Sequence, residues 1–185
     1  MSLPLESRDP IGQAVDLVMR TLRVLYIGFW ASLAIYVVVL LVVLPLTRAG
    51  TPTPDPLPRN WAQWQLFFGI VGIALLYLSQ RLRGVLIDPK SIHKYISAGS
   101  GPDAPPATAA LTQVMARIVS GHVLLWCLVE APALLGVIDR LLSGERRYFA
   151  ALAAMSAIGL ALHRPSRDRA EEAFAPLRGT AIPGG

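Results

Sequence analysis

Long apolar runs alternate with short polar connections along the chain, and this pattern predicts four membrane-spanning helices. The first run, residues 24–46, contains no charged residue. At 1.5 Å per residue, a helix of that length would extend about 34 Å, enough to cross a hydrocarbon core of about 30 Å. The other predicted spans cover residues 64–80, 118–138 and 148–163. All four should be helices, because a helix satisfies its own backbone hydrogen bonds in lipid.

The segment before the first span has a different pattern. Asp9 followed by Pro10 is typical of a helix start. Apolar residues then recur at the spacing of one helix face, at Ile11, Val15, Val18 and Leu22. We therefore expect an N-terminal interfacial amphipathic helix, whose apolar face packs on neighbouring helices or headgroups, or offers a docking face to a partner chain.

The remaining connections suggest how the chain is divided. Residues 51–58 alternate prolines with other residues, which predicts a stiff external spacer. Residues 97–106 are rich in Gly, Ser and Pro, which predicts a flexible linker after a helical extension of the second span to about Ile87. The predicted fold class is all-α, a helical membrane protein. Residues 1–165 would form a single four-helix transmembrane domain, and residues 166–185 a polar, partly disordered cytoplasmic tail.

Composition supports a membrane protein and argues against a soluble enzyme. Hydrophobic residues make up 54% of the 185 residues and charged residues only 16%, whereas an average soluble domain carries roughly 25% charge. The single cysteine, Cys127, provides neither an internal disulfide nor a metal cluster. The chain has no phosphate-binding glycine loop, zinc-type spacing or nucleophile motif. We expect no enzymatic activity, no metal and no cofactor.

The distribution of basic residues predicts the orientation. All but five of the 17 lysine and arginine residues lie in the N-terminal segment, the second connection or the C-terminal tail. The five others are Arg48, Arg59, Arg140, Arg146 and Arg147. The positive-inside rule then places both termini in the cytoplasm. Because the basic residues flank the spans, they indicate anionic headgroups of a lipid bilayer rather than nucleic acid as the partner.

Glu130 is the one candidate for chemistry within a predicted span. Along the third helix it lies roughly 20 Å from Arg117 and 14 Å from Asp139. A carboxylate at that depth should be protonated, paired or facing a wet interior. Pro132 removes a hydrogen bond to the carbonyl of Leu128 and favours a kink. A free carbonyl near a carboxyl group is a candidate ion or proton site, and His122, two turns earlier, partly shares its face.

The alternative for Glu130 is structural, a carboxyl group hydrogen-bonded to a neighbouring helix. For His122 and His163 we favour interfacial polar roles over axial ligation of a haem. Small residues four apart predict close helix packing, within the chain or with another subunit. They are Gly28 and Ser32 on the first span, and Ala153, Ala157 and Ala161 on the fourth.

Residues 129–137, which run Val-Glu-Ala-Pro-Ala-Leu-Leu-Gly-Val, resemble the carboxylate helix of the proteolipid c subunits of rotary ATP synthases. By that resemblance Glu130 would match the ion-carrying carboxylate. The chain lacks the glycine series of the c subunit's first helix, and another span follows, so we do not interpret it as a rotor subunit. Residues 117–167 also resemble uncharacterised bacterial four-helix integral membrane proteins, which implies a bacterial inner membrane but no activity.

Two functions remain open from the sequence. The first is a non-enzymatic scaffold or accessory subunit of a larger membrane complex, with protein partners or further copies of itself in the membrane. The second is a proton- or cation-coupled membrane component in which Glu130 is the titrating carboxylate.

Overall fold

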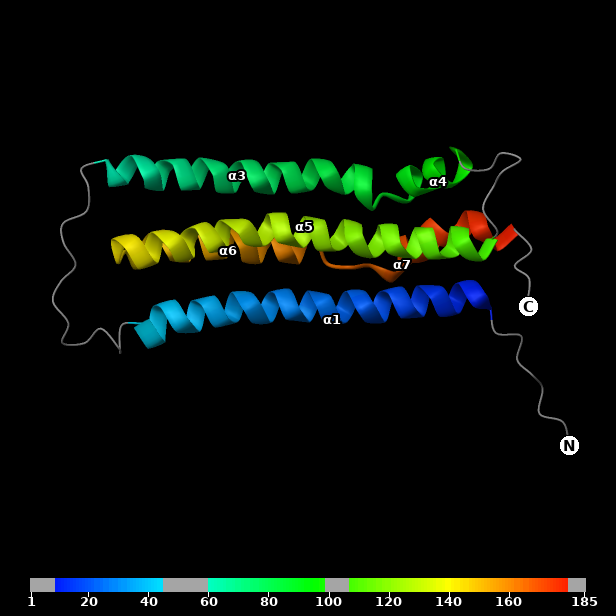
Figure 1. The fold of residues 1–185 in the computed structure, drawn as a ribbon, viewed down its shortest axis with the longest axis horizontal. Helices are drawn as coiled ribbons and strands as arrows, with labels where there is room; N and C mark the ends of the chain where they lie inside the picture. The colour runs from blue at the N-terminus through cyan, green and yellow to red at the C-terminus, as the bar shows by residue number, and fades with distance from the viewer. Residues whose placement is uncertain (1–8, 45–59, 99–106, 180–185) are drawn as a thin grey trace, which may run out of the picture. The chain divides into compact units, whose positions relative to one another are not determined.

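The described part of the computed structural model, residues 9–44, 60–98 and 107–179, is built from helices and contains no strand (Figure 1). The all-helical fold class is therefore confirmed. The predicted proline-rich spacer, most of the predicted glycine-rich linker and the last residues of the tail lie outside the described residues.

The chain divides into two compact units. The first, which we name the charged unit, comprises Met1–Leu25, Leu82–Leu124 and Pro165–Gly185. The second, the apolar unit, comprises Tyr26–Arg81 and Leu125–Arg164. The charged unit groups tail residues with the N-terminal segment and the second connection.

Helix α1 runs from Pro10 to Val38 and continues into a short π-helix, η1, over Val39–Val43. The predicted N-terminal amphipathic helix leads without a break into the first predicted span, because α1 is continuous from Pro10. Ile11, Val15, Val18 and Leu22 are all buried. The predicted apolar face is therefore packed on protein, which is one of the two environments expected for it, neighbouring helices or headgroups.

Helix α3, Trp61–Leu86, includes the second predicted span and its expected extension. Helix α4, Pro89–Ala98, occupies the start of the second connection, where no helix was predicted. Asp88 precedes it, and its Oδ1 accepts a hydrogen bond of 2.9 Å from the Lys90 N–H. Asp88 therefore satisfies a backbone donor at the helix start, which is the usual role of aspartate there.

Helix α5, Ala107–Ser143, extends beyond the third predicted span at both ends and contains Pro132. Helix α6, Arg146–Leu162, corresponds to the fourth predicted span. The turn between them contains Gly144 with φ +75°, a backbone conformation that glycine adopts without steric cost. With 17 residues, α6 would extend about 26 Å.

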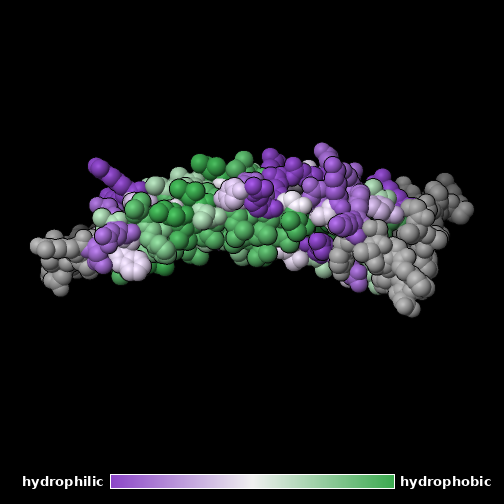
Figure 2. All heavy atoms as spheres, turned by 90° about the horizontal axis from the view of Figure 1, so that it is seen from above, coloured by the Kyte–Doolittle hydropathy of each residue, from purple (hydrophilic) through white to green (hydrophobic). Residues whose placement is uncertain are grey.

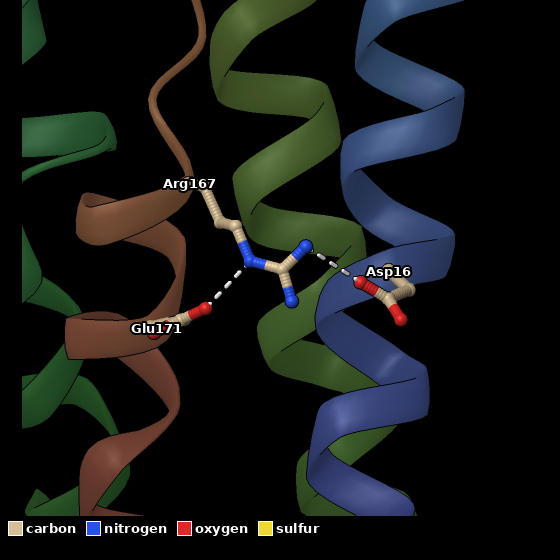
Figure 3. A network of polar contacts seen from close by, with 3 residues as sticks. All are labelled: Asp16, Arg167 and Glu171. Carbon is tan, nitrogen blue, oxygen red and sulfur yellow. Dashed lines mark hydrogen bonds and ion pairs between the residues drawn. The ribbon is translucent and has the colours of Figure 1, made fainter.

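The predicted polar tail begins with two helices, α7 at Arg167–Phe174 and the 3-10 helix η2 at Ala175–Gly179. Ala170, Ala173, Phe174 and Leu177 are buried, so an apolar face hidden among the tail's charges explains why it folds. The Arg167 guanidinium lies between Asp16 of α1 and Glu171, at 3.0 and 2.7 Å (Figure 3). Glu171 and Asp16 raise the pKa of Arg167.

Three helical stretches are long and apolar enough to cross a membrane: Pro10–Val43, Trp61–Leu86 and Thr108–Ser143. Only 11% of the apolar window is buried in each of the first two, against 44% in the third. The helix α5 is therefore the most enclosed, while α1 and α3 expose apolar side chains. Figure 2 shows a broad hydrophobic area on one face of the molecule.

Glycines allow the helices of the apolar unit to approach closely. A Cβ added at Gly159 of α6 would lie 2.5 Å from Val129 of α5 and 2.8 Å from Leu76 of α3. A Cβ at Gly136 of α5 would lie 3.2 Å from the Phe149 backbone of α6. A side chain at position 159 would overlap its neighbours, and one at position 136 would make a contact tighter than usual, so Gly159 is required by this packing.

Candidate functional site

Glu130 is half-buried in the apolar unit and faces hydroxyl groups of α1. The Ser32 hydroxyl hydrogen-bonds to Glu130 Oε1. A further hydrogen bond joins the Tyr36 hydroxyl to Glu130, and another joins Tyr36 to Ser32. We name Glu130, Ser32 and Tyr36 the carboxyl–hydroxyl cluster. In this cluster the partners of the Glu130 carboxyl group are hydroxyl groups, and none of them is a basic side chain.

The Ser32 hydroxyl has a second acceptor in the same helix. Its Oγ lies 2.8 Å from the carbonyl oxygen of Phe29. A hydroxyl carries one hydrogen, and a carbonyl oxygen can only accept. Ser32 therefore cannot donate to Phe29 and to Glu130 at the same time. Which of the two bonds it donates depends on whether Glu130 carries a proton.

Pro132 lies two residues after Glu130, about half a turn along α5, and faces other helices. It is buried, and its Cβ lies 3.4 Å from the position of a Cβ added at Gly72 of α3. The N–H of the next residue, Ala133, donates to Ser156 Oγ of α6 at 3.0 Å. Helix α5 continues through the proline. Because proline has no N–H, Pro132 cannot donate a hydrogen bond to the Leu128 carbonyl. Leu128 itself is half-buried.

His122 belongs to the charged unit, whereas Glu130 belongs to the apolar unit. Eight residues of α5 separate them, a rise of about 12 Å. The His122 ring is buried and its Nδ1 donates to the Ile118 carbonyl at 2.8 Å. This bond holds the ring along its own helix, so His122 is not part of the carboxyl–hydroxyl cluster.

A second polar cluster, which the sequence did not lead us to predict, surrounds Asp139 at one end of the apolar unit. Asp139 is completely buried. Its Oδ1 accepts hydrogen bonds of 3.1 Å from Trp61 Nε1 and from Gln65 Nε2, and its Oδ2 accepts one of 3.3 Å from Ser143 Oγ. We name these four residues the Asp139 cluster. It joins the start of α3 to the end of α5.

Two further contacts bring the other helices to the same end. The Tyr148 hydroxyl of α6 donates to the Gln65 carbonyl. The buried Arg140 of α5 donates from Nε to the carbonyl of Leu40 in η1, at 3.5 Å. A π-helix in a long helix often accompanies a specific contact. All four helices of the apolar unit therefore meet around Asp139 and Arg140.

The opposite end of α6 carries a third polar cluster, centred on His163. This side chain is buried, and its Nε2 lies 3.1 Å from Ser79 Oγ of α3. Ser79 also donates to the Leu76 carbonyl at 2.7 Å. Since Ser79 has a single hydrogen, His163 Nε2–H donates to Ser79. The His163 carbonyl accepts from Trp126 Nε1 of α5 at 3.1 Å, which satisfies a terminal carbonyl of α6.

An apolar groove of about 460 Å³ lies between α1 and α6 in the apolar unit. We name it the α1–α6 groove. Its lining consists of apolar side chains: Trp30, Leu33, Ala34, Val37, Val38, Leu41, Phe149, Ala150, Ala153, Ala154 and Ala157. The predicted small residues Ala153 and Ala157 thus line the groove, while Ala161 is exposed outside this lining.

Gly28 does not contact another helix of the described chain. It is exposed, and a Cβ added there would meet no atom within 4 Å. Ser32, the other small residue predicted on this helix face, binds Glu130. Packing of Gly28 against another subunit stays a prediction.

No group of three or more metal-binding side chains occurs among the described residues. Comparisons with family models, with curated proteins and with solved structures found no match to the chain.

Proposed function

We propose that this chain is a non-enzymatic integral membrane protein that acts as a small scaffold or accessory subunit of a larger complex in a bacterial inner membrane. The observation that carries the proposal is the α1–α6 groove. Four of its lining residues on α6 are alanines, and small residues allow the backbone of another transmembrane helix to approach closely. In this proposal a helix of a partner subunit fills the groove.

The contacts at the helix ends support four transmembrane helices. The Asp139 cluster joins the start of α3 to the end of α5, and Tyr148 at the start of α6 binds Gln65 of α3. The His163 cluster joins the end of α6 to Ser79 and Trp126. Successive helices therefore alternate in direction, as expected for a chain that crosses the bilayer with each helix.

The composition of the charged unit supports cytoplasmic termini. It contains the N-terminal segment, the second connection and the tail. These are the three segments that hold most of the basic residues. Their association is expected if all three lie on one side of the membrane, and the basic excess favours the cytoplasmic side.

A bulky substitution in the groove tests the accessory role. We expect Ala154→Phe to fill the α1–α6 groove and to remove the partner from the complex purified in mild detergent. The control is Ala151→Phe, because Ala151 is also exposed on α6 but does not line the groove. Native gels would show the smaller particle only for Ala154→Phe. A complex of unchanged size with Ala154→Phe would contradict the proposal.

The second candidate function is proton or cation coupling through Glu130, and the carboxyl–hydroxyl cluster favours it. When Glu130 is ionised, Ser32 donates to the carboxylate. When Glu130 is protonated, its O–H can donate to Ser32 Oγ, and Ser32 then donates to the Phe29 carbonyl 2.8 Å away. Each protonation state therefore has a complete hydrogen-bond arrangement, which is a requirement for reversible protonation in lipid.

Glu130→Gln separates the two candidates, because glutamine keeps hydrogen-bonding capacity but cannot be ionised. An accessory role predicts that the complex assembles unchanged and that no ion-dependent activity is affected. Coupling predicts normal assembly with loss of ion-dependent activity. Carbodiimide labelling of Glu130 that depends on pH would support coupling, and labelling at a constant level across pH would contradict it.

A further inference from the structure

A polar cavity of about 330 Å³ lies within the charged unit, where the last turn of α3, the start of α4 and helix α7 come together. Its charged lining residues are Arg83, Asp88, Arg169 and Glu172. Its volume is within the range of small-molecule sites. None of its lining residues belongs to the three polar clusters described in the apolar unit.

Two positive charges face the same cavity. The charges of Arg83 and Arg169 act on one another, and both also act on the buried His122 ring. Two positive charges held close together repel each other, and an anion bound between them would offset this electrostatic repulsion. Guanidinium groups match a phosphate group well, because each presents two parallel N–H donors.

Two negative charges line the cavity as well. Asp88 and Glu172 would repel a simple anion, but they would attract an amine. A ligand that carries a phosphate and a nearby ammonium group complements all four charges. Gly84 also lines the cavity, and a Cβ added there would meet no atom within 4 Å, so the wall beside Arg83 is open.

We propose that this cavity binds a phosphoethanolamine group, with the phosphate held by Arg83 and Arg169 and the ammonium held by Asp88 and Glu172. The natural source is the headgroup of a membrane phospholipid, because Arg83 lies in the last turn of α3, one of the helices apolar enough to span a bilayer. A soluble phosphoethanolamine ester shares the same chemistry. This inference goes beyond the proposed accessory role and does not depend on the α1–α6 groove.

Native mass spectrometry of the full chain, released from detergent after incubation with defined phospholipids, tests the proposal. We expect phosphatidylethanolamine to be retained in preference to phosphatidylglycerol, which has the phosphate but no amine. Arg169→Gln should weaken retention by roughly tenfold or more, since it removes a charge-assisted hydrogen bond. Arg178→Gln is the control, because Arg178 is exposed in the same tail and does not line the cavity.

A second pair of variants keeps every charge. Gly84→Leu should fill the cavity and reduce retention of phosphatidylethanolamine as strongly as Arg169→Gln. Gly28→Leu is its control, because Gly28 is another helical glycine with open space beside it. Equal retention of the two lipids by the wild type, or wild-type retention by both Arg169→Gln and Gly84→Leu, would overturn the proposal.

Competition distinguishes the two sources of the headgroup. If the cavity recognises phosphoethanolamine, millimolar soluble phosphoethanolamine should displace the lipid, whereas inorganic phosphate at the same concentration should not. Binding of soluble phosphoethanolamine without any retention of the lipid would assign the site to a free metabolite of this class. Displacement by inorganic phosphate to the same extent would contradict recognition of the amine.

Discussion

The two units of this chain satisfy their polar side chains in different ways. In the apolar unit, the carboxyl groups of Glu130 and Asp139 are bound by hydroxyl, indole and amide groups. In the charged unit, Arg167 pairs on the surface with Asp16 and Glu171 (Figure 3). The chemistry of the partners thus changes from neutral donors to opposite charges between the two units.

This difference follows from the solvent expected around each unit. In lipid, a polar group without a partner is costly, so a neutral hydrogen-bond donor on a neighbouring helix contributes directly to helix association. In water, an exposed ion pair competes with hydration and is screened by salt, so it contributes little. The comparison therefore predicts large effects for buried groups of the apolar unit and small effects for the surface pairs of the charged unit.

The largest effect is expected for Asp139→Ala. It removes the acceptor of the half-buried Trp61 indole and one of the two carboxylate acceptors of the Gln65 amide, which also donates to Glu145. This change at a completely buried position should lower the free energy of unfolding by about 3 kcal/mol. Unfolding in detergent mixtures, followed by circular dichroism, measures this loss. Asp139→Asn keeps an acceptor oxygen and should lose less. Equal losses for the two variants would contradict the role of the hydrogen bonds.

Gly159→Val should have the next largest effect. Its side chain would overlap Val129 and Leu76, whose atoms lie 2.5 and 2.8 Å from an added Cβ. Overpacking of this kind destabilises by about 2 kcal/mol. The same unfolding measurement with Gly28→Val provides the matched control, because Gly28 has open space. If Gly28→Val were as destabilising as Gly159→Val, the close packing of α6 would not be the cause.

A smaller effect is expected for Ser32→Ala, which removes the hydroxyl between α1 and Glu130. Side-chain hydrogen bonds between transmembrane helices average about 0.6 kcal/mol, so the unfolding free energy should fall by roughly that amount. Glu130→Gln should cost less, since an amide can still bind Ser32 and Tyr36. A larger loss for Glu130→Gln than for Ser32→Ala would show that the ionised carboxylate itself stabilises the fold.

The smallest effect is expected for Arg167→Gln. The side chains of Arg167 and Asp16 are 53% and 64% exposed, so the ion pair is largely screened by water. The unfolding midpoint should barely change, and added salt should reduce any remaining difference from the wild type. A loss comparable to that of Asp139→Ala would contradict the contrast between the two units.

The apolar periodicity predicted much of the fold because it reports burial directly. It located the helices that became α1, α3, α5 and α6, and the stripe from Ile11 to Leu22 is a buried face. It did not predict α4 or α7, whose sequences are too polar for a membrane pattern. Helix α7 forms because Ala170, Ala173 and Phe174 pack on the rest of the charged unit, a tertiary effect.

The candidate site was predictable only in part. Glu130 was conspicuous as a carboxyl group within an apolar run, but its partners depend on how α1 packs against α5. The spacing of Ser32 and Tyr36, four residues apart on one helix face, could have pointed to a shared partner, but Ser32 was predicted only as a small residue for helix packing. Asp139 lies just after the predicted third span, residues 118–138, and no local pattern indicated that it would be buried beside Trp61 and Gln65.

Extraction of membranes with alkaline carbonate tests the central claim most directly, namely that helices of this chain cross a lipid bilayer. The account predicts that the protein stays with the membrane pellet, because α1 and α3 are long and apolar enough to cross a membrane and leave most of their apolar residues unburied. A peripheral membrane protein treated in parallel should be released. Recovery of this chain in the soluble fraction with that control would contradict the account.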